Sequence, residues 1–178
     1  MPCACKKKGK LLILLGEAGT TDGNPDAWGP AVWSILHVLV NHVGNSSIDI
    51  DQIREIEVLI HSLPGILPCS DCAAHMRSYL VTSPFQCGKL LGPELNIYVQ
   101  KWLMDFHNTV RTRKSQSIDI TTLTQIQELY GTETIESCQI TTLMAHVTYG
   151  IRNGIVRADA WKKWVIHFNR LRVMTGLM

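Results

Sequence analysis

The apolar residues of this chain recur at the spacing of α-helices, and this periodicity limits the possible folds more than any other feature. Six segments with this spacing are predicted to be helical: 28–43, 50–62, 93–112, 121–130, 135–151 and 158–174. No stretch alternates apolar and polar residues over more than a few positions, as a half-buried strand would, and no internal repeat is visible. The sequence therefore predicts an all-α bundle.

Composition and charge narrow the class of protein. Hydrophobic residues make up 46% and charged residues 18% of the 178 residues, which is ordinary for a globular domain with its own core. The formal net charge of +2 is too small to indicate a nucleic-acid partner. The apolar run at 11–15 is short for a signal peptide and far too short for a membrane span. We therefore expect a soluble, intracellular protein without nucleic-acid or membrane partners.

Two of the six cysteines, Cys69 and Cys72, form a CxxC motif. Pro68 precedes the motif, and no Gly or Pro interrupts the following residues until Pro84, which places the cysteines in the first turn of a helix. Backbone N–H groups and the helix dipole lower the pKa of a thiol at that position, and the thiolate is the reactive form. Residues three apart share one helix face, so the two sulfurs can close a disulfide. The motif predicts a redox-active dithiol.

Zinc binding is the alternative reading of these cysteines, because a structural zinc site normally needs four protein ligands. The ligands of such a helical interaction module would be Cys3, Cys5, Cys69 and Cys72, or His75. The spacing favours redox chemistry over zinc, and no metal site is predicted. A thioredoxin-like fold is excluded because the βαβ pattern around its CxxC is missing. Cys87 and Cys138 are single cysteines, and a bridge between them stays open.

Three motifs occur in an order and spacing that resemble one protein family. Residues 29–37 read GPAVWSILH, residues 68–73 read PCSDCA, and residues 102–110 read WLMDFHNTV. They resemble the GxxxWxxLH, PCxxCA and Trp-led HNxVN motifs of the Erv/ALR family of flavin-linked sulfhydryl oxidases. The resemblance covers residues 28–114, and three ordered motifs are hard to obtain by chance.

The resemblance implies how the chain is organised. Residues 27–114 would form a four- to five-helix bundle that binds FAD, after a flexible N-terminal arm at 1–26 and before an additional C-terminal helical region at 115–178. Divergent viral members also extend past the usual core, which suggests a viral origin and a location in the host cytoplasm or the virion. Family members commonly dimerise through the first two helices, so a homodimer is expected, although the C-terminal helices could create a different interface.

The resemblance also assigns the residues around the cofactor. The residues that it places there are Gly29, Trp33, His37, Cys72, His107, Asn108, Val110, Arg111 and Lys114. Gly29 would allow close approach, aromatic and imidazole rings can stack on flavin or adenine, and cations can offset diphosphate charge. Arg111 replaces the second Asn of the family motif, and it either adds a phosphate contact or points to solvent. Alone, Trp33 and Val110 would be ordinary core residues on apolar stripes.

The implied reaction is the formation of protein disulfide bonds. Cys69 would exchange with thiol-containing protein substrates, and Cys72 would lie beside the flavin. Electrons would pass through this dithiol and FAD to molecular oxygen, giving hydrogen peroxide. Cys3 and Cys5 are either a mobile shuttle dithiol or an incidental pair. A helical scaffold with a degenerated FAD site is a further alternative.

Overall fold

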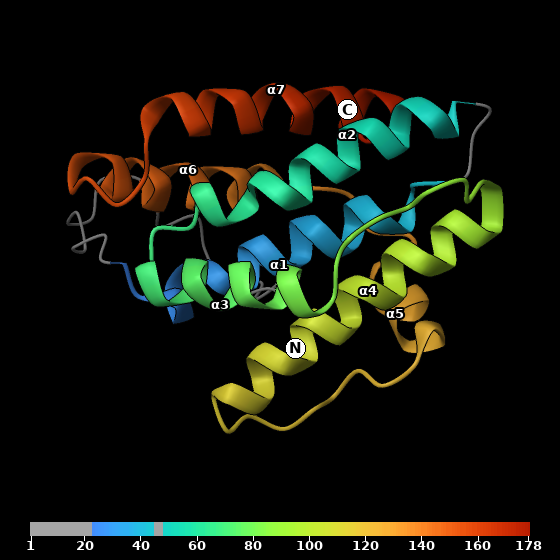
Figure 1. Cartoon of the computed structure of the whole chain (residues 1–178), viewed down its shortest axis with the longest axis horizontal. Coiled ribbons are helices and arrows are strands. Elements are labelled where there is room, and N and C mark those ends of the chain that lie inside the picture. The colour runs from blue at the N-terminus through green and yellow to red at the C-terminus, as the bar shows by residue number, and fades with distance from the viewer. Residues whose placement is uncertain (1–22, 45–47) are drawn as a thin grey trace, which may run out of the picture.

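The structure, a computed structural model, describes residues 23–44 and 48–178 (Figure 1). All regular secondary structure in these residues is helical, which confirms the predicted fold class. The elements are α1 (Pro25–Asn41), α2 (Asp49–Ser62), the 3-10 helix η2 (Leu63–Gly65), α3 (Ser70–Thr82), α4 (Gly92–Arg113), α5 (Leu123–Tyr130), α6 (Ser137–Arg152) and α7 (Ala158–Met174). The predicted N-terminal arm, with Cys3 and Cys5, lies largely outside the described residues.

Helix α1 begins three residues before the predicted start at residue 28. The side chain of Asn24 caps it by accepting a hydrogen bond from the backbone N–H of Asp26 at 3.0 Å, and Pro25 occupies the first helical turn. With a start at residue 28, Pro30 would occupy the first turn, but it lies inside the helix. The Asn-Pro pair is itself a helix start, because Asn is a preferred cap and Pro is preorganised for the first turn.

Helix α2 begins one residue before its predicted start at residue 50 and has no side-chain cap. By sequence, Asp49 or Asp51 can cap this helix, but this expectation is wrong, because Ile48 occupies the N-cap position and makes no side-chain cap hydrogen bond. Asp49 is buried, and its Oδ2 accepts a hydrogen bond from the backbone N–H of Gly92 at 2.6 Å. The carboxylate thus ties the start of α2 to the start of α4, a contact between distant segments that outweighs local capping.

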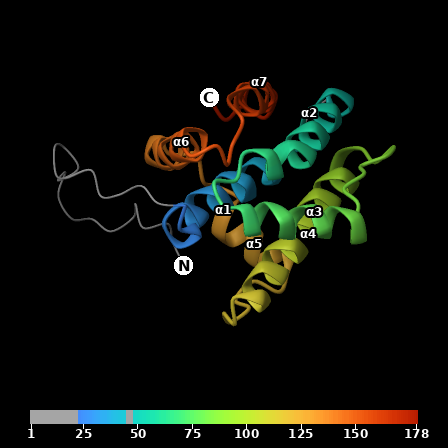
Figure 2. The same cartoon turned by 60° about the vertical axis from the view of Figure 1, so that its left-hand side comes forward.

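Helix α1 forms the centre of the bundle. It packs against α4 and α5 on one side and against α6 on the other, while α7 lies along α2 (Figures 1 and 2). Apolar side chains of α6 and α7 belong to the same core cluster as those of α1 to α4: Leu143, Val147, Trp164, Phe168 and Leu171. The helices after residue 114 thus share one core with the preceding bundle, and the division of the chain at that residue stays a prediction.

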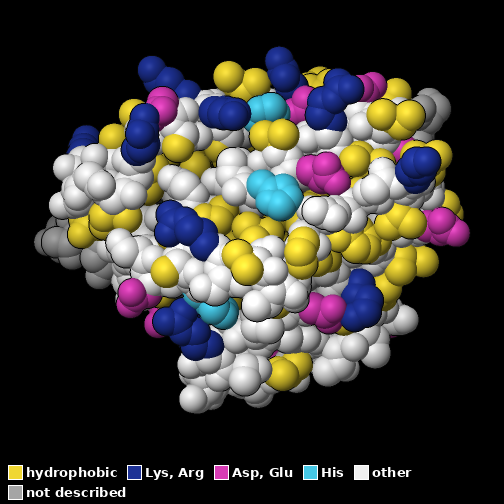
Figure 3. Space-filling view, viewed as in Figure 1, with side chains coloured by type: hydrophobic (Ala, Val, Ile, Leu, Met, Phe, Trp, Pro, Cys, Tyr) yellow, Lys and Arg dark blue, Asp and Glu magenta, His cyan; other side chains and the backbone are white. Residues whose placement is uncertain are grey.

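The surface carries side chains of every kind. Basic, acidic and hydrophobic side chains are interspersed on the face drawn in Figure 3. Within the described part of the chain, none of the helices combines the length and the apolarity needed to cross a lipid bilayer.

Cysteines Cys87 and Cys138 are both free thiols, so the bridge left open between them is not formed. Cys87 is buried, whereas Cys138 is exposed. Burial, together with the nearby carboxylate of Glu57, raises the pKa of the Cys87 thiol to about 12. Since the thiolate is the reactive form, Cys87 is inert near neutral pH.

Candidate active site

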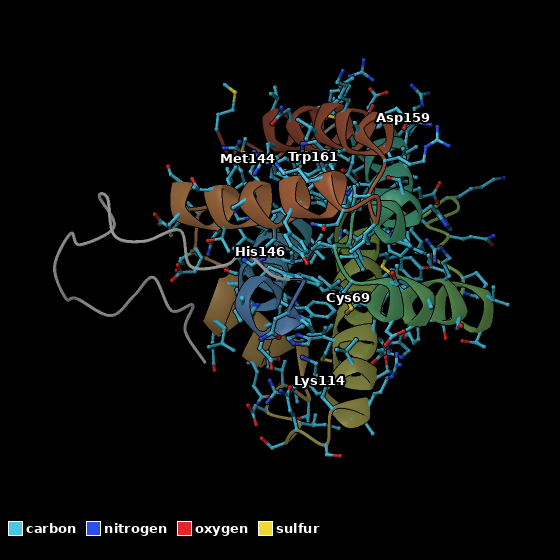
Figure 4. All side chains as sticks on the ribbon, turned by 90° about the vertical axis from the view of Figure 1, so that its left-hand side faces the viewer. Cys69, Lys114, Met144, His146, Asp159 and Trp161 are labelled. Carbon is cyan, nitrogen blue, oxygen red and sulfur yellow. A yellow bond between two sulfur atoms is a disulfide. The ribbon has the colours of Figure 1, made fainter. Side chains whose placement is uncertain are left out.

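Helix α3 begins at a disulfide between Cys69 and Cys72. Cys69 is the N-cap residue, and its Sγ accepts a hydrogen bond from the backbone N–H of Cys72 at 3.1 Å. The pair therefore lies at the start of the helix, with Cys72 in the first turn as predicted and Cys69 one position earlier, at the N-cap. Both cysteines are partly exposed, and Figure 4 shows Cys69 at the start of α3. The helix N-terminus stabilises negative charge on sulfur when the disulfide opens.

A cavity of about 1170 Å³ lies beside the disulfide and is lined by both of its cysteines. Its volume slightly exceeds the roughly 300–1,000 Å³ of most small-molecule sites. Its walls come from α1, η2, α3, α4 and α5, from the segments between them, and from the start of α6. The sequence-predicted residues that line it are Gly29, Trp33, Cys72, His107, Val110, Arg111 and Lys114. The chain therefore gathers seven of the nine residues predicted to surround the cofactor, together with Cys69, around one space that accommodates a large ligand.

Two predicted residues, His37 and Asn108, do not line this cavity. His37 is fully buried behind the wall, with its Nε2 at 3.1 Å from Nδ1 of His107. Asn108 lines a separate groove, and its Nδ2 donates to the carbonyl oxygen of Ile120 at 2.9 Å. Both residues thus support neighbours of the cavity: His37 supports a wall residue, and Asn108 fixes the segment between α4 and α5.

Stacked aromatic rings form one wall of the cavity. The rings of Trp33 and His107 lie nearly parallel, with centroids 4.0 Å apart and planes at 9°. His37, behind this wall, stacks on Tyr130 with centroids 4.8 Å apart, and Tyr130 itself lines the cavity. Flat, parallel ring faces favour a planar aromatic ligand, which can continue the stack. Tyr130 was missed at the sequence level because nothing near it in the chain signals a partner.

The two histidines are uncharged at neutral pH. Burial, with a smaller effect of the Arg111 cation, lowers the pKa of His107 to about 4. Burial, followed by the proximity of His107, lowers the pKa of His37 to about 3. A neutral imidazole has one N–H donor and one acceptor, so only one of the two rings donates in the bond between them.

The tautomers follow from the surroundings of His37. Its Nδ1 is buried and has no hydrogen-bond partner. An unpartnered N–H in that position is costlier than an unpartnered acceptor, since buried donors are almost always satisfied. His37 therefore carries its proton on Nε2 and donates it to Nδ1 of His107. His107 in turn carries its own proton on Nε2, so the wall of the cavity includes one oriented N–H donor.

Acid is expected to destabilise the protein as the pH falls from about 6.5 to about 4. Over this window, histidines of the unfolded chain, with an ordinary pKa of 6.5, bind protons that His37 and His107 in the folded chain do not. The unfolded state therefore binds more protons, and the free energy of unfolding decreases. Urea unfolding at pH about 7 and about 4.5 measures the decrease. The decrease should be smaller in His37→Gln, and an equal decrease would contradict the buried neutral histidine.

Gly29 leaves open space in the wall formed by α1. It is buried, but a Cβ added there would meet no heavy atom within 4 Å outside its immediate neighbours and helix backbone. Because Gly29 lines the cavity, such a Cβ would project toward it. Packing of the protein alone does not require a glycine at this helical position, where glycine costs roughly 0.5–1 kcal/mol relative to alanine. The geometry fits the close approach of a ligand.

Basic side chains at the cavity are held by carboxylates that sequence reasoning missed. Lys114 Nζ lies 2.5 Å from Asp26 Oδ1, and Arg111 Nη2 lies 2.6 Å from Asp119 Oδ2. Arg111 Nε also donates to the carbonyl oxygen of Ser117. Arg111 is therefore anchored to the segment between α4 and α5 and does not point freely into solvent. Both cations can bind an anionic ligand if that ligand replaces the carboxylates as their partner.

Metal binding gains no support from the described residues. No group of three or more His, Cys, Asp or Glu side chains in residues 23–44 and 48–178 comes together as a metal site. Cys69 and Cys72, the central ligands of the zinc alternative, are bonded to each other.

Comparisons of the sequence with known proteins agree on one family. Residues 30–130 match the Erv1 / Alr family. The chain is 30% identical over 96 residues to "Putative FAD-linked sulfhydryl oxidase 347L" of Invertebrate iridescent virus 6, which covers 52% of this chain and 84% of that protein. It is 26% identical over 109 residues to "FAD-linked sulfhydryl oxidase ERV1" of Arabidopsis thaliana, covering 61% of this chain and 53% of the plant protein.

A further viral relative is the "FAD-linked sulfhydryl oxidase" of African swine fever virus, 26% identical over 91 residues, which are 51% of this chain and 71% of that protein. The chain thus spans about half of the plant relative and more of these viral ones. No solved structure matches the chain significantly.

Proposed function

The chain belongs to the Erv1 / Alr family, and from this premise we propose that it is an FAD-dependent thiol oxidase whose redox dithiol is Cys69 and Cys72. One observation carries the proposal: the disulfide at the start of α3 lines the same cavity as the stacked wall of Trp33 and His107. A dithiol that exchanges electrons with a planar cofactor needs this arrangement. The proposed products are protein disulfides, and the proposed electron acceptor is molecular oxygen, which yields hydrogen peroxide.

The residues around the cavity fit FAD. We propose that the parallel rings of Trp33 and His107 accept an aromatic ring system, and that Arg111 and Lys114 offset diphosphate charge. Gly29 and Val110 would form the close, apolar part of the wall. His37 and Asn108 would act at one remove, His37 by holding the His107 ring and Asn108 by holding the segment that anchors Arg111. When bound, FAD accepts two electrons from a dithiol and passes them to oxygen.

The cysteines carry the thiol–disulfide exchange. A substrate thiolate attacks Sγ of Cys69, the bond between Cys69 and Cys72 breaks, and Cys72 leaves as a thiolate. A second substrate thiol, as its thiolate, then attacks the mixed disulfide and releases the oxidised substrate and the Cys69 thiolate. The protons of the two substrate thiols go to solvent. The backbone N–H of Cys72 donates toward Sγ of Cys69, which stabilises charge on that sulfur.

An oxygen-electrode assay tests the proposed reaction. Aerobic oxidation of dithiothreitol by the purified chain should consume about one oxygen molecule and yield about one hydrogen peroxide for each disulfide formed. Oxidation of dithiothreitol without oxygen consumption would exclude oxygen as the acceptor.

Substitution of Gly29 by Leu is expected to weaken FAD binding by about tenfold or more, because the added side chain occupies the cavity. The ligand-free protein should keep its melting temperature, since the first added atom meets open space and Leu favours helices over Gly. Titration of the ligand-free variant with FAD measures the affinity. Ala27→Leu is the matched control, since Ala27 is exposed on the same helix and does not line the cavity. Equal affinities of both variants would contradict the placement of FAD.

Cys3 and Cys5 remain a proposed shuttle for electrons from folded protein substrates. Replacing both with Ser should leave oxidation of dithiothreitol nearly unchanged, because a small dithiol reaches Cys69 directly. Oxidation of reduced thioredoxin, in contrast, should become slower. An unchanged rate with thioredoxin would exclude the shuttle.

The assembly and location of the protein are further proposals. The homodimer implied by the family resemblance would need surfaces that α6 and α7 leave open on α1 and α2. The viral relatives support a viral origin, with the host cytoplasm or the virion as the place of action.

A further inference from the structure

Pro68, the residue before Cys69, lies between two glycines that are far apart in sequence. A Cβ on Gly23 would sit 2.7 Å from the carbonyl oxygen of Pro68. A Cβ on Gly150 would sit 3.2 Å from Cβ and 3.4 Å from Cα of Pro68. Figure 4 faces this end of the molecule, where Cys69 at the start of α3 lies near α1 and α6. Gly150 therefore allows α6, and Gly23 allows the segment just before α1, to approach the residue that leads into the dithiol.

Space, and not backbone conformation, explains both glycines. Neither has a positive φ, whereas five other glycines of the described chain do. Gly150 lies inside α6, near its C-terminal end, where glycine is less favourable than alanine. That cost is offset by close packing, since a Cβ at this position would also meet Cγ2 of Val156 at 2.8 Å.

The turn between α6 and α7 is held by hydrogen bonds to Gly150. Its carbonyl oxygen accepts hydrogen bonds from the backbone N–H groups of Ile155 and Val156, at 2.8 Å and 3.1 Å. Val156 is buried and its Cβ is branched, so it cannot easily move aside. Pro68 is rigid as well, because its ring fixes φ. We therefore expect that a side chain added at Gly23 or Gly150 would push on Pro68, and that Pro68 would shift the backbone of Cys69.

We propose that Gly23 and Gly150 are positioning residues that clamp Pro68 and thereby hold Cys69 as the N-cap of α3. The proposal rests on the proposed function of Cys69 and Cys72 as the redox dithiol. It makes α6 part of the active centre, although the family match ends at residue 130. With the disulfide closed, the backbone N–H of Cys72 donates to Sγ of Cys69 at 3.1 Å. The proposed clamp keeps this N–H within reach when the disulfide opens, so that it stabilises the Cys69 thiolate of the reduced form.

Loosening the clamp should favour the disulfide over the dithiol, because the reduced form loses stabilisation of its thiolate. In Gly150→Ala, the equilibrium of Cys69 and Cys72 with reduced and oxidised dithiothreitol should shift toward the disulfide by about threefold or more. The full chain is equilibrated anaerobically, its thiols are alkylated, and the peptide with both cysteines is quantified by mass spectrometry. Gly23→Ala should shift the equilibrium in the same direction. Ala145→Ser, exposed on α6, is the matched control and should not shift it.

A rescue variant separates positioning from folding. Adding Val156→Ala to Gly150→Ala removes the 2.8 Å contact but keeps both contacts with Pro68. The melting temperature should recover while the redox shift remains. If the double variant recovers both the melting temperature and the parental redox equilibrium, the proposal is overturned. An unchanged redox equilibrium in folded Gly150→Ala would overturn it as well. A parent chain that holds no FAD would instead refute the proposed function, which this equilibrium does not measure.

Discussion

Replacing Cys72 with Ser should lower the aerobic oxidation of dithiothreitol by roughly 10³-fold or more. The substitution removes one of the two sulfurs between which the disulfide opens and closes, so no dithiol remains to carry an electron pair. FAD should stay bound, since Ser has nearly the same size and Cys72 is one of many residues that line the cavity. Oxygen consumption and the FAD content of the purified variant measure the two effects.

Cys138→Ser is the matched control for this loss of activity. Cys138 is a free, exposed cysteine that does not line the cavity, so its replacement should leave the oxidation rate at the parental value. Cys69→Ser should lose turnover as Cys72→Ser does, because each variant leaves one sulfur of the pair. Parental turnover in either active-site variant would show that the disulfide at the start of α3 is structural.

Replacing Trp164 with Ala should lower the free energy of unfolding by about 3–5 kcal/mol. Trp164 lies on α7, is only 1% exposed, and stacks on Phe168 with ring centroids 5.0 Å apart. Because α7 shares the core of the bundle, the whole protein should unfold earlier in one transition. Urea unfolding followed by helical circular dichroism measures the change.

Trp164→Phe tests whether volume or hydrogen bonding matters at this position. The indole Nε1 of Trp164 is buried without a hydrogen-bond partner, so Phe loses no hydrogen bond. Its effect should be about 1–2 kcal/mol, the result of a smaller cavity alone. Two separate unfolding transitions in Trp164→Ala would contradict the single core and would favour an independent C-terminal region.

The helices could be predicted from sequence because their signal is local. Apolar spacing placed the later helices within about two residues of their observed ends. The start of α1 was missed because Asn24 and Pro25 stand in a glycine-rich stretch that resembles a loop. Asp49 could have capped α2, but its carboxylate instead accepts a hydrogen bond from the backbone N–H of Gly92, which lies 43 residues away in the chain. Contacts of this kind leave no mark in the local pattern.

The same distinction applies to the candidate site. The motifs were enough to bring Trp33, His107 and the two cysteines to one cavity. The spacing of the motif residues did not predict how deeply each side chain is buried. His37 lies one turn after Trp33 but is buried behind the wall of the cavity. Partners from distant segments could not be predicted, because a salt bridge or close glycine contact depends on the folded path of the chain. They are Asp26, Asp119, Tyr130, Gly23 and Gly150.

The absorption spectrum and metal content of the purified full chain test the central claim that this helical cavity holds FAD beside a redox dithiol. After expression in FAD-replete cells, the protein should be yellow, with about one non-covalent FAD per chain and no zinc. Addition of dithiothreitol without oxygen should bleach the flavin band. A folded, colourless chain with bound zinc would contradict the claim in favour of a zinc-binding module. A folded chain with neither FAD nor metal would leave only a helical scaffold.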